Sequence, residues 1–178
     1  MIVLVGESAS GKSSIEKYFV DNYGYNKIIS YTTRQPRQGE IDGVDYHFIT
    51  KSQFRRLKEQ DFFAETAFYN DWYYGVAKKD CTNDKVAVLT PHGLRQVSKI
   101  KDINIISFYI NVPRRDRLIK ILQRGDNIEE SYRRNLSDVG MFDGIEDEVD
   151  FVVNNSGYHK SIAEMSKEIL HLMLTNNY

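Results

Sequence analysis

The segment that most constrains the fold of this chain lies near its N-terminus, where a glycine-rich stretch separates an apolar run from a helical pattern. Residues 2–5 form a continuous apolar run, which is typical of a strand buried on both faces of a parallel sheet. Gly6 ends this run. After Gly11, apolar side chains recur at helical spacing as far as Gly24, a residue type that commonly ends a helix. A strand, a glycine-rich turn and a helix in this order predict an α/β fold that begins with this unit.

The glycine-rich stretch follows the pattern Gly-x4-Gly-Lys-Ser of a phosphate-binding loop, or P-loop. In this motif, backbone N–H groups and the N-terminus of the next helix converge on a concavity that suits phosphate oxygens. Lys12 supplies a compact positive charge for the outer phosphates, and the Ser13 hydroxyl is a ligand for Mg²⁺. A chance match is the weaker interpretation, because the flanking strand and helix fit the motif. We expect a nucleoside triphosphate with Mg²⁺ to bind the residues Gly6, Glu7, Ser8, Ala9, Ser10, Gly11, Lys12, Ser13 and Ser14.

Strand and helix patterns alternate along the rest of the chain. Strands are expected at residues 27–31, 46–49, 62–68, 72–74, 86–89, 103–110 and 151–153, and helices at 52–60, after Pro91, at 114–123, at 128–136 and from Ile162. Continuous apolar strands alternating with helices predict a parallel sheet with helices on both faces. The hairpin-rich section from about residue 30 to 80 departs from this rhythm and predicts an inserted mixed-sheet subdomain.

Composition excludes several classes of partner. The net charge is −1 and the pI is about 6.4, so the broad basic footprint of a nucleic-acid-binding protein is missing. The basic residues between Arg114 and Arg134 are interrupted by acidic ones and predict a solvated helix face. No apolar run approaches the roughly 18 residues that a membrane span needs. The single cysteine, Cys81, cannot form an internal disulfide. We therefore expect a soluble cytoplasmic protein without nucleic-acid or membrane partners.

A second cluster of side chains lies in the predicted insertion. Arg34 and Arg37 flank Pro36, and Tyr46 follows on a predicted strand. Two guanidinium groups and a phenol suit a phosphate monoester, because arginine donates forked, charge-assisted hydrogen bonds. Glu65 lies in an apolar strand, where its carboxylate can accept from two adjacent N–H donors of a base such as guanine. From the residues alone, a solvated loop with scattered charges remains an equal alternative.

Taken in order, these motifs resemble the guanylate kinase family over essentially the whole chain. The resemblance rests on the loop Gly-x-Ser-x-x-Gly-Lys-Ser, on Ser30-x-Thr-Thr-Arg34-x-Pro-Arg37-x-Gly-Glu, on Asp45-Tyr46-x-Phe, on Phe-x-Glu65 and on Tyr73-Tyr74-Gly75. It implies an ATP-binding core of residues 1–29, 81–113 and 141–178, a GMP-binding insertion of residues 30–80 and a helical lid of residues 114–140. The implied reaction transfers the γ-phosphoryl group of ATP to GMP or dGMP.

The resemblance also implies roles for individual residues. The GMP phosphate would be held by Arg34, Arg37, Tyr46 and Tyr74, and the guanine edge would be read by Ser30 and Glu65. The charge of the transferring group would be shared by Lys12, Lys120, Arg124 and Arg134. Monomer and homodimer both stay open.

Several positions depart from the family pattern. Val88 and Thr90 stand where the family has an acidic pair, although the Thr90 hydroxyl can still hydrogen-bond a base, so Thr90 is kept among the GMP-binding residues. Val76 replaces a hydroxyl residue after Tyr-Tyr-Gly. In the lid, Lys120 and Asn135 stand at arginine positions, with Arg134 one residue before the second. Two alternatives therefore remain: a kinase of the same fold with another phosphorylated acceptor, and a guanylate-kinase-like binding module without catalysis.

Overall fold

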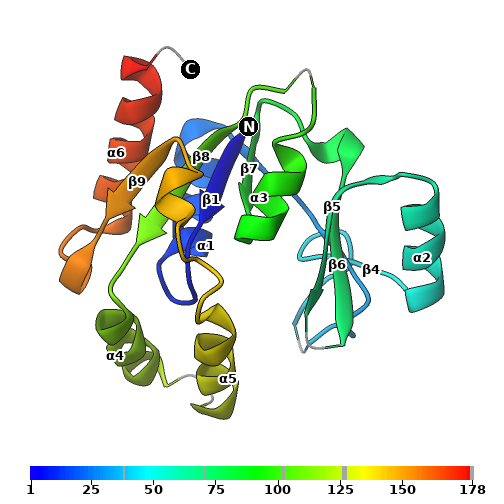
Figure 1. The fold of residues 1–178 in the computed structure, drawn as a ribbon, viewed down its shortest axis with the longest axis horizontal. Helices are drawn as coiled ribbons and strands as arrows, with labels where there is room; N and C mark the ends of the chain where they lie inside the picture. Colours follow the sequence, from blue (N-terminus) through cyan, green and yellow to red (C-terminus); the bar gives the residue numbers. More distant parts are fainter. Residues whose placement is uncertain (38, 70, 102, 126–127, 177–178) are drawn as a thin grey trace.

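The chain forms two β-sheets that lie next to each other, with helices around them (Figure 1). The structure is a computed structural model, and it describes residues 1–37, 39–69, 71–101, 103–125 and 128–176.

The larger sheet is fully parallel and has the strand order β2-β7-β1-β8-β9. Its strands are β1 (Ile2–Val5), β2 (Asn26–Lys27), β7 (Lys85–Val88), β8 (Ile106–Asn111) and β9 (Phe151–Asn154). The central strand β1 pairs on both sides, with Leu4 opposite Val88 on one side and Phe108 on the other. The predicted parallel core sheet is therefore confirmed.

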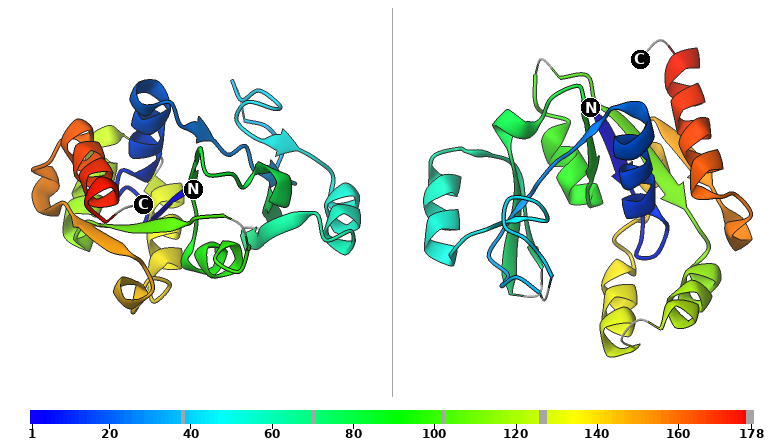
Figure 2. Two further views of the ribbon diagram at one scale, coloured as in Figure 1. Left: turned by 90° about the horizontal axis from the view of Figure 1, so that it is seen from above. Right: turned by 180° about the vertical axis from the view of Figure 1, so that it is seen from behind.

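Helices cover both faces of this sheet (Figure 2). On one face, α1 (Lys12–Tyr23) packs against β1, and α6 (Ile162–Thr175) packs against α1 and β9. Phe19 and Ile169 join Leu4 in a fully buried cluster. On the other face, α3 (Pro91–Val97) packs Val97 near Val3. Successive residues of β1 point to opposite faces, which explains why an unbroken apolar run was needed here.

The smaller sheet has the order β4-β3-β6-β5 and is mixed. Its strands are β3 (Tyr31–Thr32), β4 (His47–Phe48), β5 (Phe63–Tyr69) and β6 (Trp72–Ala77). β3 runs parallel to β4, whereas β6 is antiparallel to both β3 and β5. The helix α2 (Lys51–Glu59) stacks Phe54 on the rings of Phe63 and Tyr73, with centroids 4.5 and 5.2 Å apart. This confirms the mixed sheet, while the exact boundaries of the three predicted domains stay a prediction.

The strand expected at residues 27–31 is wrong as a single element. Lys27 is the last residue of β2 in the core sheet, and Tyr31 is the first residue of β3 in the mixed sheet. The amide of Ile28 still donates to Val86 of the core, whereas the carbonyl of Ser30 already accepts from His47 of the mixed sheet. The chain thus passes from one sheet to the other within three residues.

The chain returns to the core through residues 78–84. A short 3₁₀ helix, Lys78–Asp80, follows β6 and leads to Cys81. Cys81 is buried, its Sγ lies 3.6 Å from the carbonyl oxygen of Ala77, and burial raises the pKa of its thiol to about 11.

The two helices of the predicted lid project beyond the carboxyl ends of the core strands (Figure 1). They are α4 (Arg114–Arg124) and α5 (Ile128–Asp138). Two further 3₁₀ helices, Ile145–Asp147 and Ser156–Tyr158, flank β9.

Candidate active site

The phosphate-binding loop joins β1 to α1. A Cβ at Gly6 would lie 2.8 Å from the carbonyl oxygen of Ile110, so the loop passes too close to β8 to carry a side chain there. Gly11 has a left-handed φ of 100° and precedes the first turn of α1, a conformation that glycine adopts readily. Ala9 also has a left-handed φ, of 67°, a conformation that costs free energy for a residue with a side chain. These torsions give the loop the sharp turn that the motif predicted.

Lys12 lies along this loop. Its Nζ donates to the carbonyl oxygen of Glu7 at 2.7 Å and to Ser10 Oγ at 3.3 Å. Burial lowers the pKa of Lys12 to about 8, and the nearby carboxylates of Asp138 and Glu7 oppose that fall. At neutral pH the ammonium form therefore predominates, which is the form that binds phosphate.

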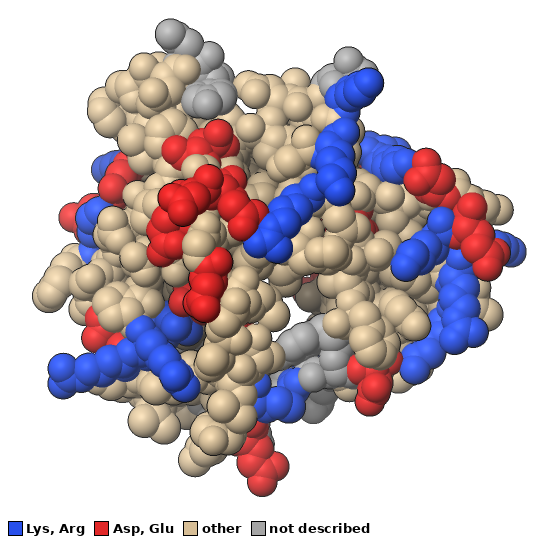
Figure 3. Space-filling model, in the orientation of Figure 1, with Lys and Arg blue, Asp and Glu red and all other residues tan. Residues whose placement is uncertain are grey.

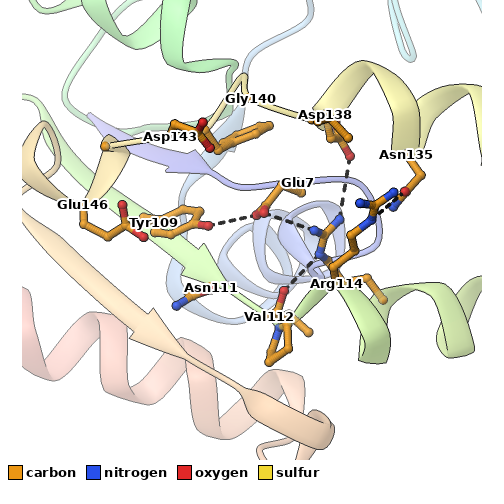
Figure 4. Close-up of a pocket in the computed structure, with 15 residues that line it drawn as sticks. Glu7, Tyr109, Asn111, Val112, Arg114, Asn135, Asp138, Gly140, Asp143 and Glu146 are labelled. Atoms are coloured by element: carbon orange, nitrogen blue, oxygen red, sulfur yellow. Dashed lines mark hydrogen bonds and ion pairs between the residues drawn. The ribbon is translucent and has the colours of Figure 1, made fainter.

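A buried ionic cluster connects the loop to the lid helices (Figure 4). Arg117 on α4 is only 4% exposed, and its Nη2 donates to Glu7 Oε1 at 3.1 Å. The other carboxylate oxygen of Glu7 accepts from the Tyr109 hydroxyl at 3.1 Å. At the end of α5, Asp138 Oδ2 accepts from the backbone N–H of Ser8 at 2.8 Å. This cluster was not predicted, because Arg117 stands in a run of charged residues that indicated a solvated helix face.

A cavity of about 510 Å³ lies beside this cluster, between the start of α4 and the end of α5 (Figure 4). Asn135 lines it, is 3% exposed, and accepts a hydrogen bond from Arg114 Nε at 3.1 Å. The Nδ2 of Asn135 has no hydrogen-bond partner among the residues that the structure describes. Asn135 therefore lies against α4.

The predicted phosphate receptor is organised by Glu40. One oxygen of Glu40 pairs with Arg34 Nη2 at 2.8 Å, and the other accepts from the backbone N–H of Arg37 at 2.7 Å. The Arg34 guanidinium is buried, lies 5.4 Å from the centroid of the Tyr46 ring, and has its pKa raised chiefly by the hydrogen bond to Glu40. The Tyr46 ring in turn lies 6.1 Å from that of Tyr74. Sequence analysis quoted Glu40 as part of a motif but assigned it no role.

Glu65 lies on β5 and is 6% exposed. Its carboxylate has no hydrogen-bond partner in the described part of the chain, and burial raises its pKa to about 7.

Thr90 lies nearby at the start of α3, where its Oγ1 accepts from the Gly93 N–H at 3.1 Å. Val76 is 1% exposed and packs into the core. Of the departures from the family pattern, Val88 and Thr90 line the large cavity described next, and Val76 is not among its lining residues.

One large cavity of about 1130 Å³ brings the two predicted sites together, and the surface is hollowed between the two sheets (Figure 3). Its lining includes the predicted site residues Gly6, Ser8, Lys12, Ser30, Arg34, Arg37, Tyr46, Glu65, Tyr74 and Thr90. The other predicted loop residues, Glu7, Ala9, Ser10, Gly11, Ser13 and Ser14, are not among its lining residues. A triphosphate on the loop and a monophosphate on the arginines would therefore share one space.

The remaining predicted catalytic residues lie on α4 and α5. Lys120 Nζ sits 5.3 Å above the Tyr158 ring, and the Tyr158 hydroxyl donates to the carbonyl oxygen of Ala9 at 2.8 Å. Lys120 thus lies beside the phosphate loop and is not among the residues that line the large cavity. The side chains of Arg124 and Arg134 lie outside the described part of the structure, so their roles stay predictions.

Comparison with known proteins adds independent evidence. The family model for guanylate kinase matches residues 1–172. The chain belongs to the guanylate kinase family. It is 31% identical to the guanylate kinase of Rickettsia bellii, over 96% of this chain and 93% of that protein. It is 30% identical to the guanylate kinase of Mycoplasma genitalium, over 96% of this chain and 75% of that protein.

A solved structure supports the same fold. The crystal structure of guanylate kinase from Anaplasma phagocytophilum superposes with a TM-score of 0.70, at 20% sequence identity, over 99% of this chain and 85% of that one. The guanylate kinase fold and the family resemblance read from the sequence are both confirmed.

Proposed function

We propose that the chain transfers the γ-phosphoryl group of ATP to GMP or dGMP, which gives ADP and GDP or dGDP. The observation that carries this proposal is the shared cavity, which is lined by Lys12 of the phosphate loop and by the acceptor cluster of Arg34, Arg37 and Glu65. Family membership supports the same reaction.

The acceptor atom is an oxygen of the GMP phosphate, which is already largely ionised at neutral pH because its second pKa is about 6. The reaction therefore needs no strong general base. This oxygen forms a bond to the γ-phosphorus, the bond from phosphorus to the bridging oxygen breaks, and ADP leaves. The protein contributes positioning and charge neutralisation. Lys12 acts on the donor phosphates, and Arg34 and Arg37 reduce the repulsion between two anionic substrates.

Mg²⁺ fits the donor side. The Ser13 side chain is exposed at the start of α1 and makes no hydrogen bond within the described part of the chain. The described residues contain no group of three histidine, cysteine or acidic side chains that would hold a metal ion by themselves. Mg²⁺ keeps several waters and takes further ligands from nucleotide phosphates, so the Ser13 hydroxyl would be one ligand among several. When bound, the ion neutralises charge on the phosphates.

A panel of acceptors tests the proposal. The purified chain is incubated with ATP, Mg²⁺ and each of GMP, dGMP, AMP, CMP, UMP and several sugar phosphates, and ADP release is measured. We expect turnover with GMP and dGMP. Turnover with a sugar phosphate instead would support the alternative of another acceptor, which Val88 and Thr90 in the cavity lining favour. ATP binding without turnover of any acceptor would indicate a non-catalytic binding module.

One variant tests the acceptor assignment separately. Arg37→Ala should raise the KM for GMP about tenfold or more and leave the KM for ATP within twofold, because a charge-assisted hydrogen bond is lost on one substrate only. Arg56→Ala is the matched control, since Arg56 is exposed on α2 beside the same sheet. Equal effects on both substrates would contradict the assignment of Arg37 to the acceptor.

We also propose a cytoplasmic location and the absence of membrane and nucleic-acid partners. Within the described residues, no helix combines the length and apolar character needed to cross a bilayer. The single thiol suits a reducing compartment. Monomer and homodimer are both consistent with the proposed chemistry.

A further inference from the structure

The Glu65 carboxylate, which is proposed to bind the guanine base, is not oriented by a side-chain hydrogen bond within the described residues. It has no hydrogen-bond partner among the described residues, yet it is 94% buried beside the shared cavity. Its direction therefore depends on the backbone of β5. The pairing of β5 with β6 shifts register between Phe63 and Glu65, and such irregularities re-aim side chains.

The backbone next to Glu65 is also at a free edge. Within the described residues, β5 is the last strand of the mixed sheet, with β6 on one side and no further strand of that sheet on the other. The N–H and carbonyl of an edge strand that point away from the sheet have no ladder partner of their own.

At Thr66, the side chain of Gln96 on α3 binds the backbone groups on the outer edge of β5. Its Oε1 accepts from the Thr66 N–H at 3.1 Å, and its Nε2 donates to the Thr66 carbonyl oxygen at 3.1 Å. A primary amide carries the same donor and acceptor as a peptide group. The Gln96 side chain thus makes the same two hydrogen bonds with Thr66 that the backbone of a neighbouring strand would make. Among natural side chains of this length, glutamine alone offers both groups.

The same face of α3 also borders Glu65 directly. Thr90, Gly93 and Gln96 are spaced by three residues and so lie along one side of the helix. A Cβ at Gly93 would lie 3.3 Å from Glu65 Oε2, so the missing side chain lets the helix approach the carboxylate closely. α3 itself is fixed in the core by Leu94 and Val97.

We propose that Gln96 is a positioning residue for the acceptor base: it holds the Thr66 backbone so that the Glu65 carboxylate faces the guanine edge. This inference rests on the proposed function. According to this inference, α3, a helix of the core and not of the insertion, contributes to the selectivity for guanine.

The test compares GMP with inosine monophosphate, which lacks the 2-amino group. An aligned, ionised Glu65 accepts from two donors of guanine and from one donor of hypoxanthine. Gln96→Met keeps the length of the side chain but removes both hydrogen bonds. We expect the ratio of kcat/KM for GMP to kcat/KM for inosine monophosphate to fall about tenfold, with the KM for ATP within twofold. Gln60→Met, on the exposed end of α2, is the control and should leave the ratio unchanged.

A double-mutant cycle distinguishes positioning from a general structural role. If Gln96 acts through Glu65, Gln96→Met has no further effect on the ratio in a Glu65→Gln background. Additive effects would overturn the inference. It would also be overturned if Gln96→Met lowered the melting temperature but kept the ratio, or raised the KM values for GMP and ATP equally. Gln96→Glu, which keeps an acceptor for Thr66 N–H but loses the donor, should give an intermediate ratio.

The proposed function fails in a different way. If the wild-type chain neither turns over GMP nor binds it in calorimetry, both the proposed function and this inference are overturned. If the wild-type chain prefers GMP and the Gln96→Met chain keeps that preference, the inference alone is overturned.

Discussion

Burial and recognition act on the Glu65 carboxyl group in opposite directions. Burial raises its pKa to about 7, which favours the neutral form. The proposed recognition of two N–H donors of guanine needs the ionised form. Because the pKa in the folded state is above its ordinary value of about 4.5, the folded state gains stability from this group below pH 4.5 and loses it as the pH rises through 7.

GMP binding should therefore depend on pH through Glu65. We expect the KM for GMP to fall as the pH rises from 6 to 8.5, and to fall less in Glu65→Gln, where the phosphate and Lys12 titrate as in the wild type but residue 65 does not. The two pH profiles are measured at saturating ATP. Parallel profiles would show that Glu65 is not the titrating group. Thermal melts give a second readout: Glu65→Gln should be more stable than the wild type at pH 8 and similar to it at pH 4.

The residues that form motifs could be predicted from the sequence, whereas the residues that position those motif residues could not. Lys12, Arg34 and Glu65 stand in recognisable patterns, and the structure places all three in one cavity. Gln96 and Arg117 match no pattern, because their partners lie 30 and 110 residues away. A buried arginine and a solvated one look the same in a sequence.

At the scale of elements, the lid helices are tied to the phosphate loop. Arg117 of α4 pairs with Glu7, and its Nη1 lies 3.8 Å from Asp138 at the end of α5. The N–H of Ser8 completes the connection through Asp138. The start of α4 and the end of α5 are therefore both bonded to the loop that is proposed to hold the donor phosphates.

Removing the arginine should be costly. Arg117→Ala removes the buried cation that pairs with the half-buried Glu7 and Asp138 carboxylates, so we expect a loss of about 3 kcal/mol in the free energy of unfolding. Denaturant titration measures this loss. Arg115→Ala, exposed on the same helix, is the control and should change stability by less than about 0.5 kcal/mol. Equal stabilities of the two variants would contradict the role assigned to the cluster.

Strands were predicted correctly where their burial did not depend on which strands they pair with. The run 2–5 is buried on both faces whichever strands lie beside it, and it is a strand at those bounds. The run 27–31 was wrong, because its two ends pair with different sheets. Apolar character predicts that a segment is buried, but it does not predict which neighbour it pairs with.

At the scale of the whole molecule, the chain crosses between the two sheets twice, at residues 28–30 and 78–84. Gln96 joins the same two parts at Thr66. The shared cavity lies between these two parts, which suits a site that must admit two substrates and then exclude water.

A ligand that spans this cavity should bind better than its halves. We expect a polyphosphate with adenosine at one end and guanosine at the other to raise the melting temperature more than ATP and GMP together at equal concentrations, because the second contact becomes intramolecular. Arg37→Ala should remove most of the additional rise, since it weakens one end. No additional rise in the wild-type chain would show that the two sites are not occupied at the same time.

Cys81 has a practical consequence. With its pKa near 11 and its sulfur buried against Ala77, it is almost wholly in the unreactive thiol form at neutral pH. Maleimide dyes should therefore attach only to cysteines introduced elsewhere. Pairs of labels on α5 and on the tip of the β5–β6 hairpin can then report the opening of the cavity by energy transfer, without first replacing the native residue.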